Sequence, residues 1–250
     1  MTKLTAIILS IMLTMSAVGL GAQENKKVIN FAVDPTFPPL EYIDANGRLV
    51  GYGIDYFTAV CQESGLEANF VQENWEGIFN RLNDGNYDAI MASVTITPER
   101  RKTMNFTIPY HIVRQSLIVP QNSSVANIRQ LKGLRIGILT ESTAVEIAEK
   151  IQEAKLQTFP SVEEAIKALV DGQLDAVICE DVVGANFLVQ PDIANKIKMV
   201  AVINTPGAEE LYAVAVRKNN LDILVALNDG IKAVKTNGIE AELRRKWIRD

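Results

Sequence analysis

The chain is poor in the residues that metal centres and nucleophilic enzymes need. Its 250 residues include two cysteines and a single histidine, His111. Cys61 and Cys179 lack the spacing of metal ligands, and His111 has no partner for a metal cluster or a hydrolase triad. The sequence therefore predicts no metal site, no cofactor and no catalytic residue.

Basic residues are also too few and too scattered to attract polyanions. The chain has 25 Lys and Arg against 30 Asp and Glu, which gives a formal net charge of −5. A mildly acidic chain without a Lys/Arg cluster argues against nucleic acid or an anionic membrane surface as a partner. With 48% hydrophobic and 22% charged residues, the composition is that of an ordinary globular protein.

Long apolar runs are absent beyond the first residues. Lys3 precedes an almost unbroken apolar run over residues 6–18, and small residues lead to Ala22. This pattern predicts a signal peptide over residues 1–22 and a periplasmic protein. The alternative is a membrane anchor, but the run is shorter than the roughly 20 residues of a membrane span. No cysteine follows the run, so we expect no lipid anchor.

One phrase occurs twice, at residues 81–93 (RLNDGNYDAIMAS) and 168–180 (ALVDGQLDAVICE). In each copy an apolar helix meets an Asp-Gly stop and a short apolar strand follows. The repeat predicts two similar α/β lobes. Because ligands of open α/β sheets bind beyond the carboxyl ends of the strands, Ser93 and Glu180 are expected at matching places in one cleft.

Strand and helix patterns alternate along the rest of the chain, without a Gly/Ser-rich linker between lobes. The chain itself must therefore cross between them, and strands 115–119 and 211–216 are the expected crossings, forming a hinge. Lobe 1 is predicted to comprise residues 23–112 and 212–250, and lobe 2 residues 113–211. Cys61 and Cys179 would then lie in different lobes as separate buried thiols, although a secreted chain permits a disulfide.

The first copy of the repeat leads into a short helix that carries an arginine. Thr97 suits the N-cap and Pro98 the first helical position, which places Arg100 in the first turn. Its guanidinium can hold a carboxylate through two parallel hydrogen bonds, with Ser93 and Thr95 beside it. The alternative is a surface arginine on a capped helix.

These residues belong to an ordered set of motifs that closely resembles the extracytoplasmic solute-binding proteins of polar amino acid ABC transporters. The resemblance covers essentially the whole mature chain. It implies a type II periplasmic binding protein, monomeric, with a ligand cleft between lobes, hinged by two crossing strands, and with a membrane permease as partner. The motifs are Asp34-Pro-Thr-Phe-Pro-Pro-Leu-Glu-Tyr, Gly51-Tyr-Gly-Ile-Asp, Trp75, residues 91–100, Phe106-Thr-Ile-Pro-Tyr, Leu131-Lys-Gly-Leu-Arg-Ile-Gly, Asp175-Ala-Val, Tyr212-Ala-Val-Ala-Val-Arg-Lys and Lys246-Trp.

The resemblance assigns the amino-acid head group to residues of both lobes. It implies that Arg100 binds the ligand α-carboxylate, with Ser93 and Thr95 helping, and that Ser142 and Thr143 contact the same carboxylate from lobe 2. A capping-box pattern that starts at Thr143 independently predicts a helix N-terminus, which offers N–H groups to anions. The alternative role for Thr143 is a cap alone.

The resemblance assigns the ligand side chain to three further residues. Phe37 and Trp75 match aromatic walls, which suit aliphatic stems and cations alike. Asp34 matches a position on the pocket floor that in relatives often bonds a polar or cationic side chain. The alternatives are ordinary packing for Trp75 and a turn before Pro35 for Asp34.

Two positions depart from the family pattern. Glu180 stands where the family usually has the Asp that binds the α-ammonium, so either Glu180 or the neighbouring Asp181 is expected in that role. Glu141 stands where the family usually has Gly. If Glu141 faced inwards, it would join Asp34 and Glu180 in an acidic pocket for a cationic ligand such as Lys, Arg or ornithine; otherwise it faces solvent.

The sequence thus predicts a non-enzymatic protein that binds a polar, possibly cationic, L-amino acid and delivers it to an ABC permease. The alternative is an enzyme on the same scaffold, similar to cyclohexadienyl dehydratases. Val183 occupies the position where those enzymes keep their acid, so only Glu180 would suggest catalysis. A sensor domain would need a signalling module or a second membrane span. The single histidine, His111, is expected to pack at the hinge and not to act as a base.

Overall fold

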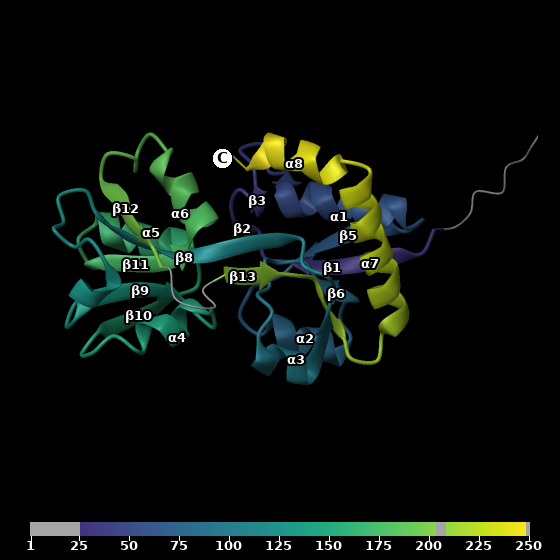
Figure 1. The fold of residues 1–250 in the computed structure, drawn as a ribbon, viewed down its shortest axis with the longest axis horizontal. Helices are drawn as coiled ribbons and strands as arrows, with labels where there is room; N and C mark the ends of the chain where they lie inside the picture. Colours follow the sequence, from purple (N-terminus) through teal and green to yellow (C-terminus); the bar gives the residue numbers. More distant parts are fainter. Residues whose placement is uncertain (1–25, 204–208, 249–250) are drawn as a thin grey trace, which may run out of the picture.

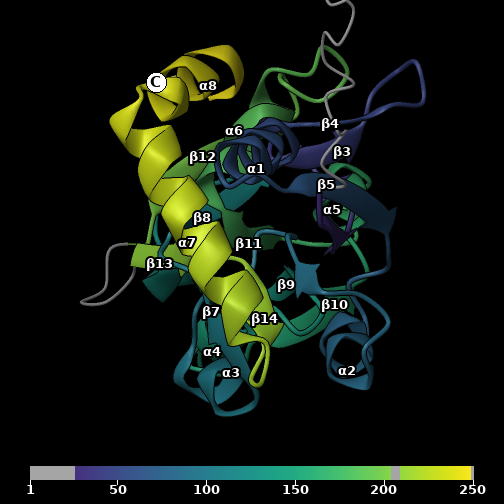
Figure 2. The same cartoon turned by 90° about the vertical axis from the view of Figure 1, so that its right-hand side faces the viewer.

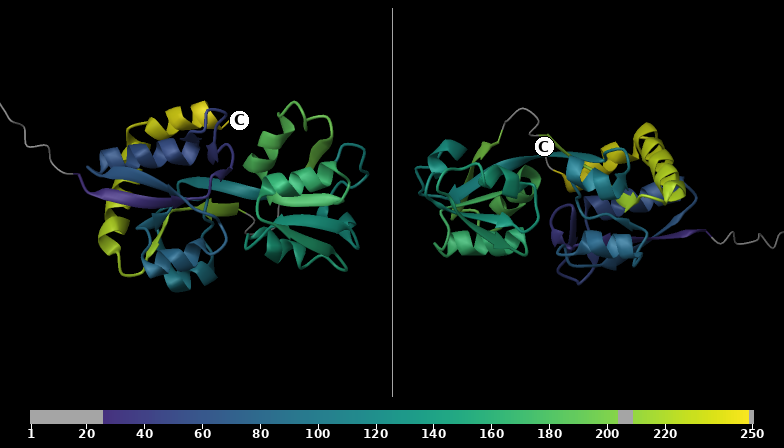
Figure 3. Two further views of the ribbon diagram at one scale, coloured as in Figure 1. Left: turned by 180° about the vertical axis from the view of Figure 1, so that it is seen from behind. Right: turned by 90° about the horizontal axis from the view of Figure 1, so that it is seen from below.

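The computed structural model describes residues 26–203 and 209–248, and within them the chain forms two α/β lobes at opposite ends of the long axis (Figures 1 and 3). The expected signal peptide lies outside the described residues. None of the helices in the described ranges is long and apolar enough to cross a membrane. Cys61 and Cys179 are free and buried, as predicted.

Lobe 1 is built on a sheet with the strand order β5-β1-β6-β14-β7. Alternate residues of its strands pack against helices on opposite faces, as the apolar runs of strands buried on both sides predict. The long helix Leu221–Thr236 (α7) lies at the front of this lobe in Figure 2. The strands are Glu67–Gln72 (β5), Val28–Val33 (β1), Ala89–Ile90 (β6), Ala215–Arg217 (β14) and Met104–Phe106 (β7); Tyr52–Glu63 (α1), Leu221–Thr236 (α7) and Ile239–Trp247 (α8) cover one face, and Ile78–Asp84 (α2) and Pro98–Thr103 (α3) the other.

Lobe 2 has the same plan, with the strand order β10-β9-β11-β8-β12. Two helices cover one face of its sheet and a short helix covers the other (Figure 1). The strands are Lys155–Phe159 (β10), Arg135–Leu139 (β9), Ala176–Glu180 (β11), His111–Pro120 (β8) and Ile197–Val202 (β12); the helices are Val162–Val170 (α5), Asp181–Leu188 (α6) and Ala144–Ala148 (α4).

The repeated phrase has the same structure in both lobes. Gly85 and Gly172 take φ values of +87° and +74°, the left-handed conformation that ends α2 and α5. Three residues after each glycine, an aspartate accepts a backbone N–H from the neighbouring strand. Asp88 accepts the backbone N–H of Asn30 at 2.9 Å, and Asp175 accepts that of Arg135 at 2.8 Å. The repeat therefore fixes two neighbouring strands together in each lobe.

Two antiparallel strands pass between the lobes. β8 pairs with β11 and β12 in lobe 2, and its first residues pair with β13 (Glu209–Tyr212). The prediction of one strand over 211–216 was wrong, because the chain leaves β8 after Tyr212 and joins the lobe 1 sheet as β14. His111 is buried at this crossing beside Tyr52 and Tyr212, as expected. Burial lowers the pKa of the His111 imidazole to about 4, so it stays neutral at pH 7.

A small sheet supports the loop that follows β1. Its strands are Thr36–Phe37 (β2), Glu41–Ile43 (β3) and Leu49–Val50 (β4), in antiparallel order. Gly51, at φ +139°, lies where an added Cβ would be 2.1 Å from the carbonyl oxygen of Leu40, so only glycine fits there. This close approach holds the hairpin against the start of α1.

Candidate ligand-binding site

A cavity lies between the lobes, and all nine predicted site residues line it. Six of the nine belong to lobe 1, including Trp75 from the segment before α2, and three belong to lobe 2. Four further residues join them. The lining is Asp34, Thr36, Phe37, Glu41, Trp75, Ala92, Ser93, Thr95, Arg100, Leu139, Ser142, Thr143 and Glu180.

Arg100 lies at one end of the cavity, held as its sequence context predicts. The Thr97 side chain caps α3 by accepting the Arg100 backbone N–H at 3.1 Å. The guanidinium lies 4.8 Å from the Phe79 ring centroid and donates to the carbonyl oxygen of Thr95 at 2.9 Å. It also donates across the cleft to the carbonyl oxygen of Glu141 at 3.1 Å. Burial lowers the pKa of Arg100, but an arginine side chain remains a cation in proteins.

Thr143 stands at the start of α4, but the predicted capping box does not form. Its side chain makes no cap hydrogen bond within α4. The hydroxyl donates instead to the carboxylate of Glu210 at 2.7 Å, while Ser142 donates to the carbonyl oxygen of Leu139 at 2.7 Å. A capping box needs the Thr143 oxygen as an acceptor and an extended backbone at the N-cap, whereas Thr143 has helical angles of φ −68° and ψ −19°.

Glu210 is a residue that the sequence analysis missed. Its carboxylate accepts hydrogen bonds from Thr95 at 2.7 Å, from Thr143, and from the side-chain amide of Gln115 at 3.0 Å. Thr95 belongs to lobe 1, Thr143 to lobe 2, and Gln115 to β8. An isolated bridge between Thr95 and Tyr212 brings Thr95 close to β13. The available signal was a glutamate two residues before Tyr212, on the same face of a crossing strand.

The opposite end of the cavity is acidic. Asp34 accepts the backbone N–H of Trp75 at 3.0 Å. Glu41 was also missed by the sequence analysis; its side chain is fully buried, and neither carboxylate oxygen forms a hydrogen bond of normal geometry within residues 26–203 and 209–248, although the Ser93 hydroxyl lies near enough to act against the rise in its pKa. Burial raises the pKa of Glu41 well above its ordinary value, and the charges of Asp34 and Glu180 add to this. Burial likewise raises the pKa of Asp34.

Glu180, and not Asp181, lines the cavity. Glu180 ends β11, is 5% exposed, and accepts from the side-chain amide of Gln115 at 3.2 Å. Burial and then the charge of Glu210 raise the pKa of Glu180 to about 7. Asp181 is turned to the backbone, where it accepts the N–H of Val182 at 2.8 Å and that of Arg114.

Glu141 takes the second of its two expected positions. Its side chain is exposed, and the residue has a φ of +55°. That left-handed conformation favours glycine, which explains why glycine suits this position in the family. Glu141 contributes its carbonyl oxygen to Arg100, and Glu41 supplies the carboxylate that an inward-facing Glu141 would have brought.

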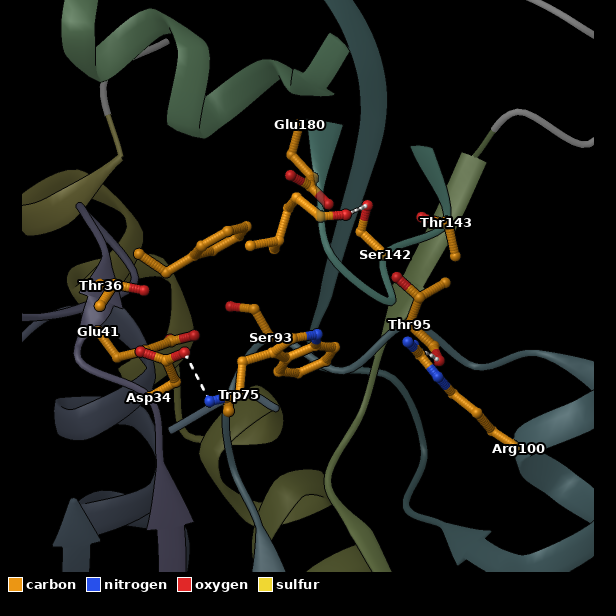
Figure 4. A pocket seen from close by; sticks show the side chains of 13 residues that line it. Asp34, Thr36, Glu41, Trp75, Ser93, Thr95, Arg100, Ser142, Thr143 and Glu180 are labelled. Carbon is orange, nitrogen blue, oxygen red and sulfur yellow. Dashed lines mark hydrogen bonds between the residues drawn. The ribbon is translucent and has the colours of Figure 1, made fainter. Parts of the chain in front are cut away.

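Phe37 and Trp75 both line the cavity. The Trp75 indole N–H donates across the cleft to the carbonyl oxygen of Thr140 at 3.0 Å, and its ring meets Phe79 edge-to-face, with centroids 5.2 Å apart. In Figure 4, Trp75 and Ser93 lie between Asp34 and Glu41 on one side and Arg100 on the other. The cavity thus has a cationic end, an acidic end and an aromatic wall between them.

Comparisons with known proteins show which family the chain resembles. The family described as bacterial extracellular solute-binding proteins, family 3, matches residues 29–250. A probable histidine-binding protein of Neisseria gonorrhoeae is 30% identical over 89% of this chain and 83% of its own length. ABC transporter arginine-binding protein 1 of Escherichia coli strain K12 is 29% identical over 97% of this chain and 98% of its own. The structure of an ancestral arginine-binding protein bound to arginine aligns with a TM-score of 0.83 and 30% identity, covering 90% of this chain and 99% of that one.

Proposed function

The chain belongs to the bacterial extracellular solute-binding proteins of family 3, and we propose that it binds a basic L-amino acid, such as arginine, lysine or ornithine, for delivery to an ABC transporter permease. Its relatives named above include proteins called arginine-binding and histidine-binding. The observation that carries the choice of a basic ligand is the buried, unpaired carboxylate of Glu41.

The head group of the amino acid is assigned to the end of the cavity that holds Arg100. The guanidinium there supplies the charge for an α-carboxylate, and two of its N–H groups already point to carbonyl oxygens of opposite lobes. Glu180 faces the same cavity with a carboxylate for the α-ammonium. Opposite charges on opposite strand ends match a zwitterion.

The side chain of the amino acid is assigned to the acidic end. A buried carboxylate without a hydrogen-bond partner is strongly unfavourable unless a cation or donor meets it. A guanidinium or ammonium placed between Glu41 and Asp34 would meet this need, with its methylene stem along Phe37 and Trp75. A neutral amide of the same length would supply donors but no charge.

Closure of the lobes is assigned to the crossing strands. Three sets of hydrogen bonds join lobe 1 to lobe 2 at the cleft, from Trp75, from Arg100 and through Glu210. A ligand whose carboxylate is held by Arg100 of lobe 1 and whose ammonium is held by Glu180 of lobe 2 favours the closed form, because it has partners in both lobes only there. In this proposal the permease recognises the closed form with its bound amino acid.

The cellular setting follows from the same proposal. The protein acts in the periplasm after removal of a signal peptide at residues 1–22, and it acts as a monomer. A catalytic role receives no support from the cavity, because Val183, at the position of the acid in cyclohexadienyl dehydratases, is a fully buried valine of α6 with no proton to donate.

Titration calorimetry of the mature protein with a panel of amino acids tests the proposal. We expect L-arginine, L-lysine or L-ornithine to bind at least about tenfold more tightly than L-glutamine or L-glutamate, because only the basic side chains neutralise Glu41. Binding that prefers glutamine or glutamate would overturn the assignment of a basic ligand. No heat with any of the twenty amino acids or ornithine would overturn amino-acid binding itself. Turnover of prephenate or arogenate would support the enzyme instead.

A further inference from the structure

We propose that Glu210 on β13 is a positioning residue that makes the site selective for a protonated α-amine and holds the two lobes together. The proposal rests on the proposed function for the identity of the ligand, but it concerns a residue outside the set that lines the cavity among the described residues. It follows from where the hydroxyl protons of Thr95 and Thr143 must lie.

Glu210 joins the lobes through one carboxylate. Thr95, in lobe 1, donates to its Oε2 at 2.7 Å. Thr143, in lobe 2, lies 2.8 Å from Oε1 and 2.7 Å from Oε2. Both threonines line the cavity, whereas Glu210 stands behind them on the crossing strand. Separation of the lobes would therefore break at least one hydrogen bond to a carboxylate.

The amide of Gln115 fixes the direction of these hydrogen bonds. Its Nε2 lies 3.0 Å from Glu210 and 3.2 Å from Glu180, both of which are acceptors. The amide must therefore present its N–H groups, because its oxygen would repel two carboxylates. The same Nε2 lies 3.3 Å from the hydroxyl oxygen of Thr143, and an amide NH2 group cannot accept the Thr143 proton.

Each threonine hydroxyl has a single proton. The carboxylate of Glu210 is the acceptor within reach of both, so both protons point out of the cavity toward β13. Toward the ligand these hydroxyls then present lone pairs only. They favour an ammonium group, which has only donors, and disfavour a carboxylate, which has only acceptors. Free threonine hydroxyls would instead adapt to either kind of group.

The Glu210→Gln variant is the direct test, because it keeps the size of the side chain and replaces an acceptor oxygen with a donor. The one remaining oxygen has two lone pairs for three donors, Thr95, Thr143 and the Gln115 amide, so at least one of these donors loses its acceptor. Glu209→Gln is the matched control: it changes the neighbouring residue of the same strand, which is exposed and pairs with Arg114. Calorimetry would use L-arginine and 5-guanidinopentanoate, which is arginine without its α-amino group.

For wild type and Glu209→Gln we expect the same strong preference for L-arginine over 5-guanidinopentanoate. For Glu210→Gln we expect this preference to shrink by at least about tenfold, through weaker binding of L-arginine with little change for the analogue. An unchanged ratio of the two affinities would overturn the proposal, including the case in which both ligands weaken equally, since a merely structural role predicts that result.

Small-angle scattering of the ligand-free proteins separates this proposal from the proposed function. We expect a larger radius of gyration for Glu210→Gln than for wild type and Glu209→Gln, because the interlobe bridge is weakened. Equal radii in all three proteins would contradict the role of Glu210 in joining the lobes. If wild type bound no basic amino acid, the proposed function would fall, and the scattering result would still decide the role of Glu210 as a bridge.

Discussion

The two ends of the cavity differ in how their polar groups are satisfied. Around Arg100, the guanidinium donates to carbonyl oxygens of Thr95 and Glu141, and the threonine hydroxyls donate to Glu210. At the other end, neither carboxylate oxygen of Glu41 has a hydrogen-bond partner among the described residues, and Asp34 accepts the backbone N–H of Trp75. One end is organised in advance, and the other holds a buried carboxyl group whose pKa is raised by burial.

This difference separates general recognition from selection. The organised end presents features common to every amino acid, because each carries the same carboxylate and ammonium. The acidic end distinguishes between side chains, because a buried carboxylate favours a cation and penalises a neutral or anionic group. Substitutions at the two ends should therefore have different effects, which the following experiments measure.

The largest effect is expected for Arg100→Ala. A ligand carboxylate would then be buried without its charged partner, and affinity for any amino acid should fall by about 100- to 1000-fold. Arg101→Ala is the matched control, since Arg101 is exposed on the same helix and should leave affinity unchanged. Calorimetry with L-arginine measures both. Retention of wild-type affinity by Arg100→Ala would contradict the assigned role of this end of the cavity.

Glu41→Gln should change selectivity rather than abolish binding. Affinity for L-arginine should fall by about 10- to 100-fold, while affinity for a neutral ligand such as L-citrulline should change little. Glu141→Gln, an exposed carboxylate on the other lobe, is the control and should alter neither. An equal loss of affinity for arginine and citrulline in Glu41→Gln would mean that Glu41 supports the fold and does not select a charged side chain.

Glu180 should make both binding and stability depend on pH. Its pKa of about 7 means that ligand binding near pH 6 must expel a proton, because the cation requires the ionised form. Affinity for L-arginine should therefore fall as the pH is lowered from 8 to 6, and calorimetry in buffers of different ionisation enthalpy should detect proton release at pH 6 but not at pH 8. Proton uptake at pH 6 would contradict this account.

The same group should affect the free energy of unfolding in the opposite direction. Its folded pKa lies above the unfolded value of about 4.5, so its contribution is fully present below pH 4.5 and is lost as the pH rises through 7. Glu180→Gln should therefore be more stable than wild type by about 1–3 kcal/mol at pH 8 and nearly equal to it at pH 4.5. Urea unfolding at the two pH values measures this difference.

The smallest effect is expected for Trp75→Phe. The variant keeps an aromatic wall but loses the indole hydrogen bond to Thr140 of the other lobe. Affinity for L-arginine should fall by about three- to tenfold, the usual weight of one hydrogen bond. Trp247→Phe loses an indole bond to Asp55 within lobe 1 and should leave affinity unchanged. Equal changes in affinity in the two variants would contradict a role of the Trp75 hydrogen bond in closing the lobes.

Features governed by local chemistry could be predicted from the sequence. The Asp-Gly stops at Gly85 and Gly172, the capped helix that carries Arg100, and the cavity position of Glu180 all follow from patterns within a few residues. The resemblance to family motifs added Phe37 and Trp75. All nine predicted residues reach one cavity because the two lobes place matching strand ends opposite each other.

Features set by long-range packing could not be predicted. Glu41 lies in a quoted motif, but its burial depends on the short hairpin that β2 and β3 form against α1. Glu210 acquires its role from the pairing of β13 with β8, nearly one hundred residues away in sequence. The Thr143 hydroxyl donates to the same carboxylate, and the helical backbone angles of Thr143 leave the predicted capping box unformed. In each case a distant acceptor or close approach outweighs the local pattern.

The most direct test of the central claim compares L-arginine with L-citrulline on the wild-type protein by titration calorimetry at pH 8. The two ligands have nearly the same shape and differ in the charge of the side chain. Because the acidic end of the cavity holds the unpaired Glu41, arginine should bind at least about tenfold more tightly. Equal affinities, or tighter binding of citrulline, would contradict selection by charge at that end.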